Sequence, residues 1–266
     1  MLLALCVIAM QARTERVVIN GSVGKLKAIL QVPVTAKSGK IPLAIICHGF
    51  MNSKDGSLVK CIADSLEEHG IASIRFDFVG HGESEGAQTD MTVPREIEDA
   101  KSVYAYARKL PYVGDIAMVG HSQGGVVTAM TSALLTSERI KAMVLLSPAA
   151  ALRDDTLRGN LFGTAYDAAN PPESVTILGG AYTIGQQYVK TAQDLPIYET
   201  ARTYEGQALI IHGKADNIVP YTYGKRFHDE IRHSHFNLIE GEDHMYQNRE
   251  NRPASMVARF LERELK

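Results

Sequence analysis

The chain has 266 residues, of which 45% are hydrophobic and 22% are charged, a balance typical of a globular protein. Its 28 lysines and arginines against 30 aspartates and glutamates give a formal net charge of −2. Nucleic-acid-binding domains carry a strongly basic patch, so this charge argues against that class of protein. The length is compatible with a single domain.

The three cysteines are Cys6, Cys47 and Cys61, too few for a disulfide framework. None of them lies in a CxxC or CxxH pattern, so the sequence does not predict a structural zinc site. We expect the protein to need neither a metal nor an organic cofactor.

The N-terminal segment is apolar over residues 1–10, which is shorter than the roughly 20 residues needed to cross a bilayer. Residues 1–12 are similar to the apolar part of a secretory signal. They lack a positively charged start, and Met10 stands where a small residue would precede a cleavage site. We interpret residues 1–24 as a leader followed by a first strand, and localisation stays open between the cytoplasm and export.

Short apolar runs predict strands that are buried on both faces, as in parallel sheets. The expected strands are 16–19 and 25–32, joined by a turn at 20–21, then 43–47, 71–78, 115–119, 142–146, 208–211 and 236–239. Helical patterns cover 58–69, 93–110, 126–135 and 255–265. This alternation predicts an α/β fold with a mostly parallel central sheet flanked by helices. We expect one domain over residues 25–266.

Residues 149–202 interrupt the alternation of strands and helices. They contain short helical pieces and the pairs Pro171-Pro172 and Gly179-Gly180, but no apolar run of strand length. Segments longer than about 12–15 residues are uncommon as plain loops. The tyrosine and leucine content of this segment favours an ordered structure, so we expect a lid insertion after the sixth strand.

A G-x-S-x-G motif stands at residues 120–124, between a predicted strand and a predicted helix. In this context the serine occupies a tight, strained turn that holds its hydroxyl above the edge of the sheet. The N-terminus of the following helix directs N–H groups toward the same place, where they favour negative charge. Ser122 is therefore the predicted nucleophile, and His121 is interpreted as a packing or loop residue.

A serine nucleophile needs a base within hydrogen-bond reach, and the base needs an orienting carboxylate. In the strand–turn–helix context the order along the chain is serine, acid, histidine. Asp216 follows the predicted strand 208–211, and His244 follows the predicted strand 236–239. All three residues lie beyond the carboxyl ends of strands, where open α/β sheets bind ligands. We predict Ser122, Asp216 and His244 as the catalytic residues.

Other residues of the same types are weaker candidates. Glu242 and Asp243 are rival carboxylates, but they are so close in sequence to the predicted base that a side-chain approach is awkward. Ser147 lacks flanking glycines and is interpreted as the end of a strand. Asp77 and His81 are interpreted as parts of a strand-end turn beside the site.

Charge that develops on a carbonyl oxygen is stabilised by backbone donors. One donor is expected from the residue after the nucleophile, Gln123, and the other from the loop after the third strand. In that loop Phe50 follows His48 and Gly49. We predict the backbone N–H groups of Phe50 and Gln123 as the oxyanion hole, and Gly49 as a residue that permits the turn.

The sequence resembles the α/β-hydrolase superfamily over residues 25–266. The motifs that carry this resemblance are HGF at 48–50, DxxGHGxS at 77–84, GHSQGG at 120–125, HGxxDxxVP at 212–220 and GxxH at 241–244. Within the superfamily the chain resembles the bacterial feruloyl (cinnamoyl) esterases. The signals for that are less specific: GHSQGGVV, LLSPAAAL and the segment 192–199.

The resemblance implies a serine esterase that releases ferulic or related hydroxycinnamic acids through an acyl-enzyme, with the lid closed over the aromatic acid. It implies that Asp155 and Tyr182 bind the phenolic hydroxyl, although both residues also fit an ordinary lid surface. A buried phenol without a partner costs about 1–3 kcal/mol, which is why such partners are needed. The chain departs from the family pattern at Phe162, which replaces a polar residue such as glutamine.

Two alternatives stay open. A monoacylglycerol lipase or short-chain carboxylesterase would have a lid richer in exposed leucine, isoleucine and phenylalanine, whereas Tyr166, Tyr182 and Tyr188 favour aromatic or sugar esters. A non-catalytic ligand-binding protein on the same fold is the alternative from another class. The expected partner is a small-molecule ester, in the favoured interpretation a plant cell-wall hydroxycinnamoyl ester. No nucleic acid and no membrane span are expected, and the oligomeric state is open between a monomer and a homodimer.

Overall fold

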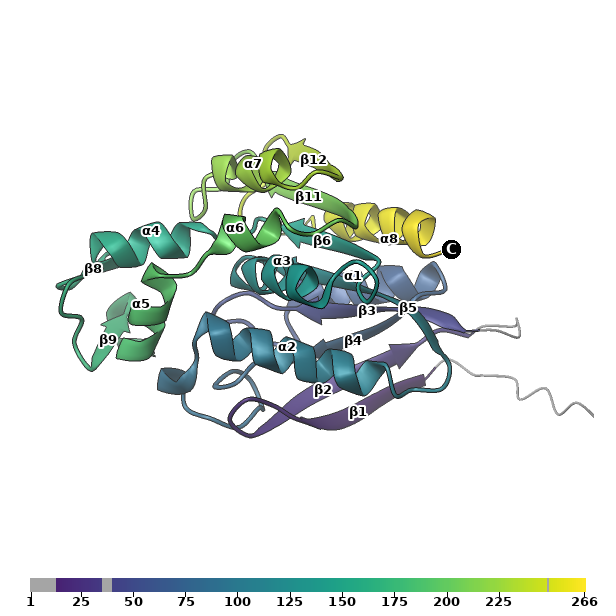
Figure 1. Cartoon of the computed structure of the whole chain (residues 1–266), viewed down its shortest axis with the longest axis horizontal. Helices are drawn as coiled ribbons and strands as arrows, with labels where there is room; N and C mark the ends of the chain where they lie inside the picture. The colour runs from purple at the N-terminus through teal and green to yellow at the C-terminus, as the bar shows by residue number, and fades with distance from the viewer. Residues whose placement is uncertain (1–12, 35–39, 248) are drawn as a thin grey trace, which may run out of the picture.

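Eight strands form the central sheet of the computed structural model, in the order β1-β2-β4-β3-β5-β6-β11-β12 (Figure 1). The structure describes residues 13–34, 40–247 and 249–266, so the expected leader at 1–12 lies outside the described residues. The strands are β1 Arg13–Asn20, β2 Lys25–Val32, β3 Ile41–Cys47, β4 Ala72–Phe76, β5 Val113–His121, β6 Ala142–Leu146, β11 Gln207–Gly213 and β12 Ser234–Ile239. The six strands from β4 to β12 in this order pair in parallel, which confirms the predicted α/β architecture.

The first two strands form an antiparallel hairpin at one edge of the sheet, and β2 also pairs antiparallel with β4. Asn20 pairs with Lys25, and the N–H of Gly21 donates to the carbonyl of Gly24. The connection is therefore a four-residue loop over 21–24, and the predicted two-residue turn at 20–21 is wrong.

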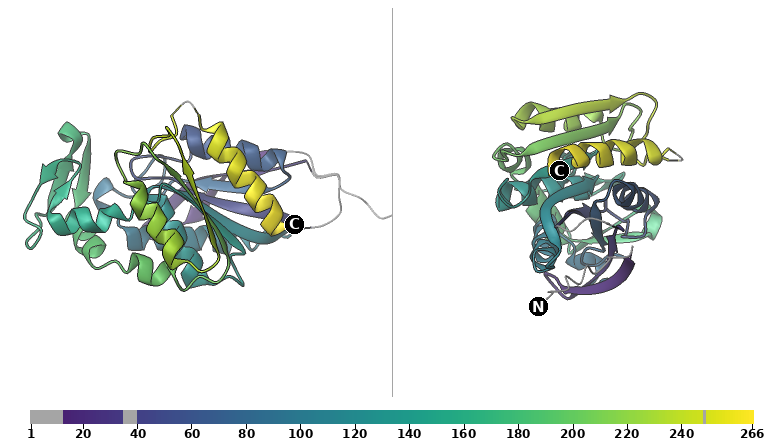
Figure 2. Two further views of the ribbon diagram at one scale, coloured as in Figure 1. Left: turned by 90° about the horizontal axis from the view of Figure 1, so that it is seen from above. Right: turned by 90° about the vertical axis from the view of Figure 1, so that its right-hand side faces the viewer.

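Alternate side chains of β3 face two different helix layers, which explains its unbroken apolar sequence. Ile45 and Cys47 pack in the layer with α2 (Val93–Ala107) and α3 (Gln123–Leu135). Ala44 and Ile46 pack in the layer with α1 (Ser57–Glu68) and α8 (Asn251–Leu265). Figure 2 shows the sheet with helices on both sides, so both faces of its central strands are buried.

The helix and strand boundaries differ from the predicted ones by a few residues at most ends, and one helix between two predicted strands has no counterpart in the predicted elements. This helix, α7 (Tyr221–Glu230), connects β11 to β12. No helix in the described part of the chain has the length and apolar composition to cross a bilayer.

The segment 149–202 is an ordered insertion between β6 and β11, and most of it lies together at one end of the molecule, while residues 197–201 pack near α3 (Figures 1 and 2). Its elements are α4 Ala151–Arg158, β7 Asn160–Leu161, β8 Thr164–Ala165, β9 Ser174–Ile177, the 3-10 turn η2 Leu178–Gly180, β10 Tyr182–Gly185, α5 Gln186–Gln193 and α6 Ile197–Ala201. The segment contains two short antiparallel hairpins, β7–β8 and β9–β10, although it has no apolar run of strand length. The backbone N–H of Thr183 donates to the side chain of Gln88, which ties the second hairpin to the 3-10 turn η1 (Gln88–Asp90).

Candidate active site

Ser122 occupies a sharp turn between β5 and α3, with a φ of 56° in the left-handed region that a serine rarely adopts. Two glycines make the turn possible. A Cβ atom on Gly120 would lie 2.1 Å from the carbonyl oxygen of Gly124, and one on Gly124 would lie 2.2 Å from that of His48. Because no side chain fits at these two places, β3, β5 and α3 approach closely enough to hold the serine at the end of the sheet.

Three loops that are far apart in the sequence bring a hydroxyl, an imidazole and a carboxylate into contact. His244 Nε2 lies 2.9 Å from Ser122 Oγ, and His244 Nδ1 lies 2.7 Å from Asp216 Oδ2. Asp216 follows β11 and His244 follows β12, both at the carboxyl ends of their strands. With its proton on Nδ1, the imidazole donates to Asp216 and accepts from the serine hydroxyl, so a base and its orienting carboxylate stand in series behind Ser122.

The carboxylate of Asp216 accepts hydrogen bonds from four donors. Oδ2 accepts from His244 and, at 3.1 Å, from His212 Nε2. Oδ1 accepts from the backbone N–H groups of Ile218 at 3.0 Å and Val219 at 2.8 Å. Burial opposes ionisation, but the hydrogen bonds from the two histidines outweigh it and hold the pKa of Asp216 well below its usual value. Asp216 is therefore a charged acceptor at any pH near neutrality.

His121 is buried next to His244 and contacts its backbone. Its Nε2 donates to the carbonyl oxygen of His244 at 2.8 Å, and the two rings lie 5.0 Å apart. Burial lowers the pKa of His121 to about 3, so the ring is neutral. The residue expected only to pack or to lie in the loop thus also fixes the position of the His244 backbone.

A cavity of about 350 Å³ opens beside Ser122, between the ends of the strands and the insertion. Its lining combines apolar residues with a few polar groups: Phe50, Ser122, Gln123, Ala149, Ala151, Leu152, Asp155, Asn160, Leu161, Phe162, Gly163, Tyr188, Asn217, Ile218 and Val219. A concave, mostly apolar site with few converging polar groups is typical of a small-molecule pocket.

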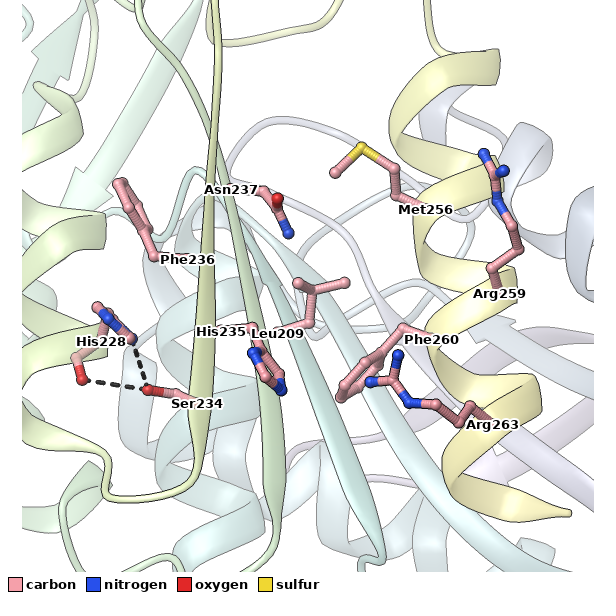
Figure 3. Close-up of a pocket in the computed structure, with 10 residues that line it drawn as sticks. All are labelled: Leu209, His228, Ser234, His235, Phe236, Asn237, Met256, Arg259, Phe260 and Arg263. Atoms are coloured by element: carbon pink, nitrogen blue, oxygen red, sulfur yellow. Dashed lines mark hydrogen bonds between the residues drawn. The ribbon is translucent and has the colours of Figure 1, made fainter.

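A second hollow, of about 570 Å³, lies between β12 and α8 and shares no lining residue with this cavity (Figure 3). It places His235 of the strand near Phe260 and Arg263 of the helix, and Asn237 opposite Met256. Since Ser122, Asp216 and His244 do not line this hollow, we place the candidate active site at the smaller cavity, which Ser122 lines.

Both residues predicted to supply oxyanion donors line the cavity next to Ser122. The side chain of Gln123 is held on two sides: its Nε2 donates to Glu96 Oε2 at 2.9 Å, and its Oε1 accepts from the Tyr188 hydroxyl at 2.8 Å. Phe50 packs edge-on against Tyr182, with ring centroids 4.8 Å apart. These contacts fix the first turn of α3 and the loop after β3, from which the two backbone N–H groups come.

The two residues implied for phenol binding are placed differently. Asp155 lines the cavity and pairs with Arg158. Tyr182 is buried, its hydroxyl lies 3.3 Å from His81 Nε2, and its ring packs against Phe50 of the cavity wall, so its role in phenol binding stays a prediction. Tyr188 of the same insertion lines the cavity. Nothing local in the sequence distinguishes the two tyrosines, because the fold of the insertion decides where each buried hydroxyl lies.

The rival residues are engaged elsewhere. Ser147 Oγ lies 2.9 Å from the Tyr246 hydroxyl, and Asp77 Oδ2 accepts from the buried Lys54 ammonium at 2.9 Å. Glu242 is buried and faces Arg249 at 3.5 Å, while Asp243 accepts the backbone N–H of Met245 at 3.0 Å. None of these contacts connects with the hydroxyl of Ser122.

Comparison with known proteins gives matches over most of the chain. A family model described as serine aminopeptidase, S33, matches residues 41–170. The structure of Est1E from Butyrivibrio proteoclasticus with ferulic acid bound is 31% identical, with a TM-score of 0.88, and the match covers 94% of this chain and 99% of that chain. Alpha/beta hydrolase domain-containing protein 10 from mouse has a TM-score of 0.72 at 20% identity, over 95% of this chain and 100% of that chain, and shares the fold.

Curated relatives match over shorter parts. Palmitoyl-protein thioesterase ABHD10, mitochondrial, of Homo sapiens is 22% identical over 209 residues, which is 76% of this chain and 65% of that protein. An uncharacterized 31.7 kDa protein of Escherichia coli is 36% identical over 107 residues, 40% of this chain and 36% of that protein. The chain therefore spans about one third to two thirds of the length of these curated relatives.

Proposed function

Because this chain belongs to the α/β-hydrolase superfamily, we propose that it is a serine esterase that releases ferulic or related hydroxycinnamic acids from their esters. A hydrolase of this type needs a nucleophile, a base and an acid in contact, and Ser122, His244 and Asp216 have that geometry. The ferulic acid bound to Est1E, on a fold that superposes over most of both chains, supports the choice of acyl group. The single observation that carries the proposal is the series of hydrogen bonds from Ser122 through His244 to Asp216, beside a cavity that Phe50, Phe162 and Tyr188 help to line.

The proposed reaction proceeds in two steps. His244 Nε2 takes the proton of Ser122 as Oγ attacks the ester carbonyl carbon, and Asp216 stabilises the imidazolium that forms. The tetrahedral intermediate collapses, the bond from carbon to the alcohol oxygen breaks, and the alcohol leaves with the proton from His244. Water then attacks the acyl-Ser122 bond by the same route and frees the acid and the serine.

The backbone N–H groups of Phe50 and Gln123 are the proposed donors to the oxyanion. Gln123 N–H lies at the N-terminus of α3, where the helix dipole also favours negative charge. Loss of one such donor typically costs about 2.7–4 kcal/mol in the transition state. The hydrogen bonds of the Gln123 side chain with Glu96 and Tyr188 hold this residue in position at the start of α3.

The cavity offers hydrogen-bond acceptors to the aromatic acid. The Tyr188 hydroxyl donates its only proton to Gln123, so its oxygen is left to accept a hydrogen bond. The carboxylate of Asp155 also accepts. An acyl group with a phenolic hydroxyl supplies a donor to the Tyr188 oxygen and to the lone pairs of Asp155 that Arg158 leaves free, and its ring contacts Leu152 and Leu161. We propose that the insertion 149–202 acts as a lid over this acid, and that the alcohol is a plant cell-wall sugar.

The test compares the ethyl esters of ferulic, 3,4-dimethoxycinnamic and butyric acids, which share one alcohol. We expect ferulate to have the highest kcat/KM and the dimethoxy ester, which has no phenolic donor, to fall by roughly tenfold or more. Asp155→Ala should remove most of that difference, whereas the exposed insertion residue Asp194, changed to Asn, should not. Faster turnover of ethyl butyrate than of ethyl ferulate would instead identify a short-chain carboxylesterase and contradict the proposed substrate.

A further inference from the structure

The hairpin β7–β8 of the insertion turns through an unfavourable residue. Asn160 pairs with Ala165 and Leu161 with Thr164, so Phe162 and Gly163 form a two-residue loop. Both have positive φ, 50° at Phe162 and 83° at Gly163. Such loops favour asparagine, aspartate or glycine at the first position, whereas a bulky side chain with positive φ is an outlier. Asn160 stabilises the turn by accepting the N–H of Gly163 at 3.0 Å.

The side chain of Phe162 gains little burial in return for this strain. It is 47% exposed, so it contributes only in part to an apolar core. Its main aromatic contact is with Phe50, at a centroid distance of 5.5 Å and an interplanar angle of 14°. This stacked pair joins the insertion to the loop after β3, and both rings line the cavity beside Ser122.

Strained, exposed residues that persist at a ligand cavity point to a functional constraint. We propose that Phe162 is a specificity-determining residue, whose ring is held by stacking on Phe50 and supplies an aromatic surface of the cavity on which the planar acyl group of the substrate packs. This inference rests on the proposed function, because it names the residue that recognises the ring of a hydroxycinnamoyl group. Offset or edge-on packing of that ring on Phe162 favours an aromatic acid over an aliphatic acid of similar reactivity.

Variants of Phe162 can distinguish a role in substrate specificity from a role in folding. Asparagine suits the first position of the turn better than phenylalanine, so Phe162→Asn should fold at least as stably as the wild type. Phe162→Tyr keeps an aromatic ring and the backbone strain. Leu178 is a matched control in the same insertion: it is 44% exposed, has a φ of 52°, and lies outside the residues that line the cavity.

The experiment measures kcat/KM for ethyl ferulate and ethyl butyrate, together with the unfolding midpoint, for the wild type, F162N, F162Y and L178N. We expect F162N to keep or raise the midpoint while the ferulate-to-butyrate ratio falls by roughly threefold to tenfold, the size of one lost aromatic contact. F162Y and L178N should keep the ratio.

Two results would overturn the inference: a wild-type ratio in F162N, or a lowered midpoint in F162N with an unaltered ratio, which would assign the ring to the fold. Failure of the proposed function has a different signature. In that case the wild type itself turns over ethyl butyrate in preference to ethyl ferulate, whatever the variants do.

Discussion

At the scale of single residues, His212 is a second histidine on the carboxylate that orients His244. Its Nε2 lies 3.1 Å from Asp216 Oδ2 and 2.9 Å from the carbonyl oxygen of Val219. Two acceptors at one nitrogen require a proton there, so Nε2 is a donor. Within the described part of the chain Nδ1 has no hydrogen-bond partner, and a Cβ on Gly224 would lie 2.3 Å from it. His212 therefore acts as a donor in a closely fitted site, a positioning residue for Asp216.

Two substitutions of His212 distinguish its hydrogen bond to Asp216 from the space that its ring fills. His212→Phe keeps a ring but leaves Asp216 with one fewer donor, and we expect kcat to fall roughly tenfold, the cost of one hydrogen bond to a charged group. His212→Gln places an amide N–H near the position of Nε2 and should recover much of that loss.

The pH profile of kcat/KM distinguishes this role from a merely structural one. Loss of the donor raises the pKa of Asp216 from well below its usual value toward that value, so activity at strongly acidic pH, where this carboxylate takes up its proton, should be lost at a higher pH in H212F and return toward the wild type in H212Q. Equal kcat values and superimposable profiles for the two variants would show that His212 only fills space.

At the scale of elements, the buried strands were predictable because burial on both faces requires a continuous apolar run, which is visible in the sequence of the strand itself. The runs at 43–47 and 142–146 are apolar at every position, since successive side chains enter opposite helix layers. β6 was predicted with its observed bounds. The glycines around Ser122 are equally local, because the turn they permit is specified within five residues.

The hairpins of the insertion were missed because their pattern is alternation and not a continuous apolar run. In β9, Val175 and Ile177 are buried while Ser174 and Thr176 are exposed. Helix α7 was given no range because it buries only Gly224 and Phe227, which is too few for a clear helical period.

The site could be predicted where its residues follow strands, and could not where it depends on the insertion. Ser122, Asp216 and His244 each stand at a strand end, so the topology of the sheet alone brings them together. Tyr188 enters the cavity from α5, a helix whose docking depends on contacts distant in sequence. Tyr182 is likewise placed by the β9–β10 hairpin, which turns its hydroxyl toward His81.

At the scale of the whole molecule, stability depends on pH through Glu96, a buried carboxyl of α2 beneath the site. Burial raises its pKa well above the usual value, although the hydrogen bond from Gln123 acts in the opposite direction. The folded state therefore holds a proton that the unfolded chain releases above about pH 4.3. Stability is lost as the pH rises from that value toward the folded pKa.

Glu96→Gln removes this titration while keeping an oxygen that accepts from Gln123. We expect E96Q to unfold at a higher temperature than the wild type at pH 8, by about 2–4 °C for each kcal/mol of relieved destabilisation. This difference in unfolding temperature should become smaller as the pH is lowered toward 4. Thermal scans at several pH values give the comparison. A gap that does not change with pH would mean that Glu96 is ionised in the folded protein.

The central claim is that Ser122 attacks the substrate, and covalent labelling tests it most directly. We would treat the protein with a fluorophosphonate, follow ester hydrolysis, and locate the adduct by mass spectrometry of the digested chain, with Ser122→Ala as the control. The account predicts a single adduct on Ser122 that appears as activity disappears, and an S122A variant that folds, takes no label and is slower by roughly a thousandfold or more. An S122A variant that hydrolyses esters at the wild-type rate, or inactivation with the label on another residue, would contradict it.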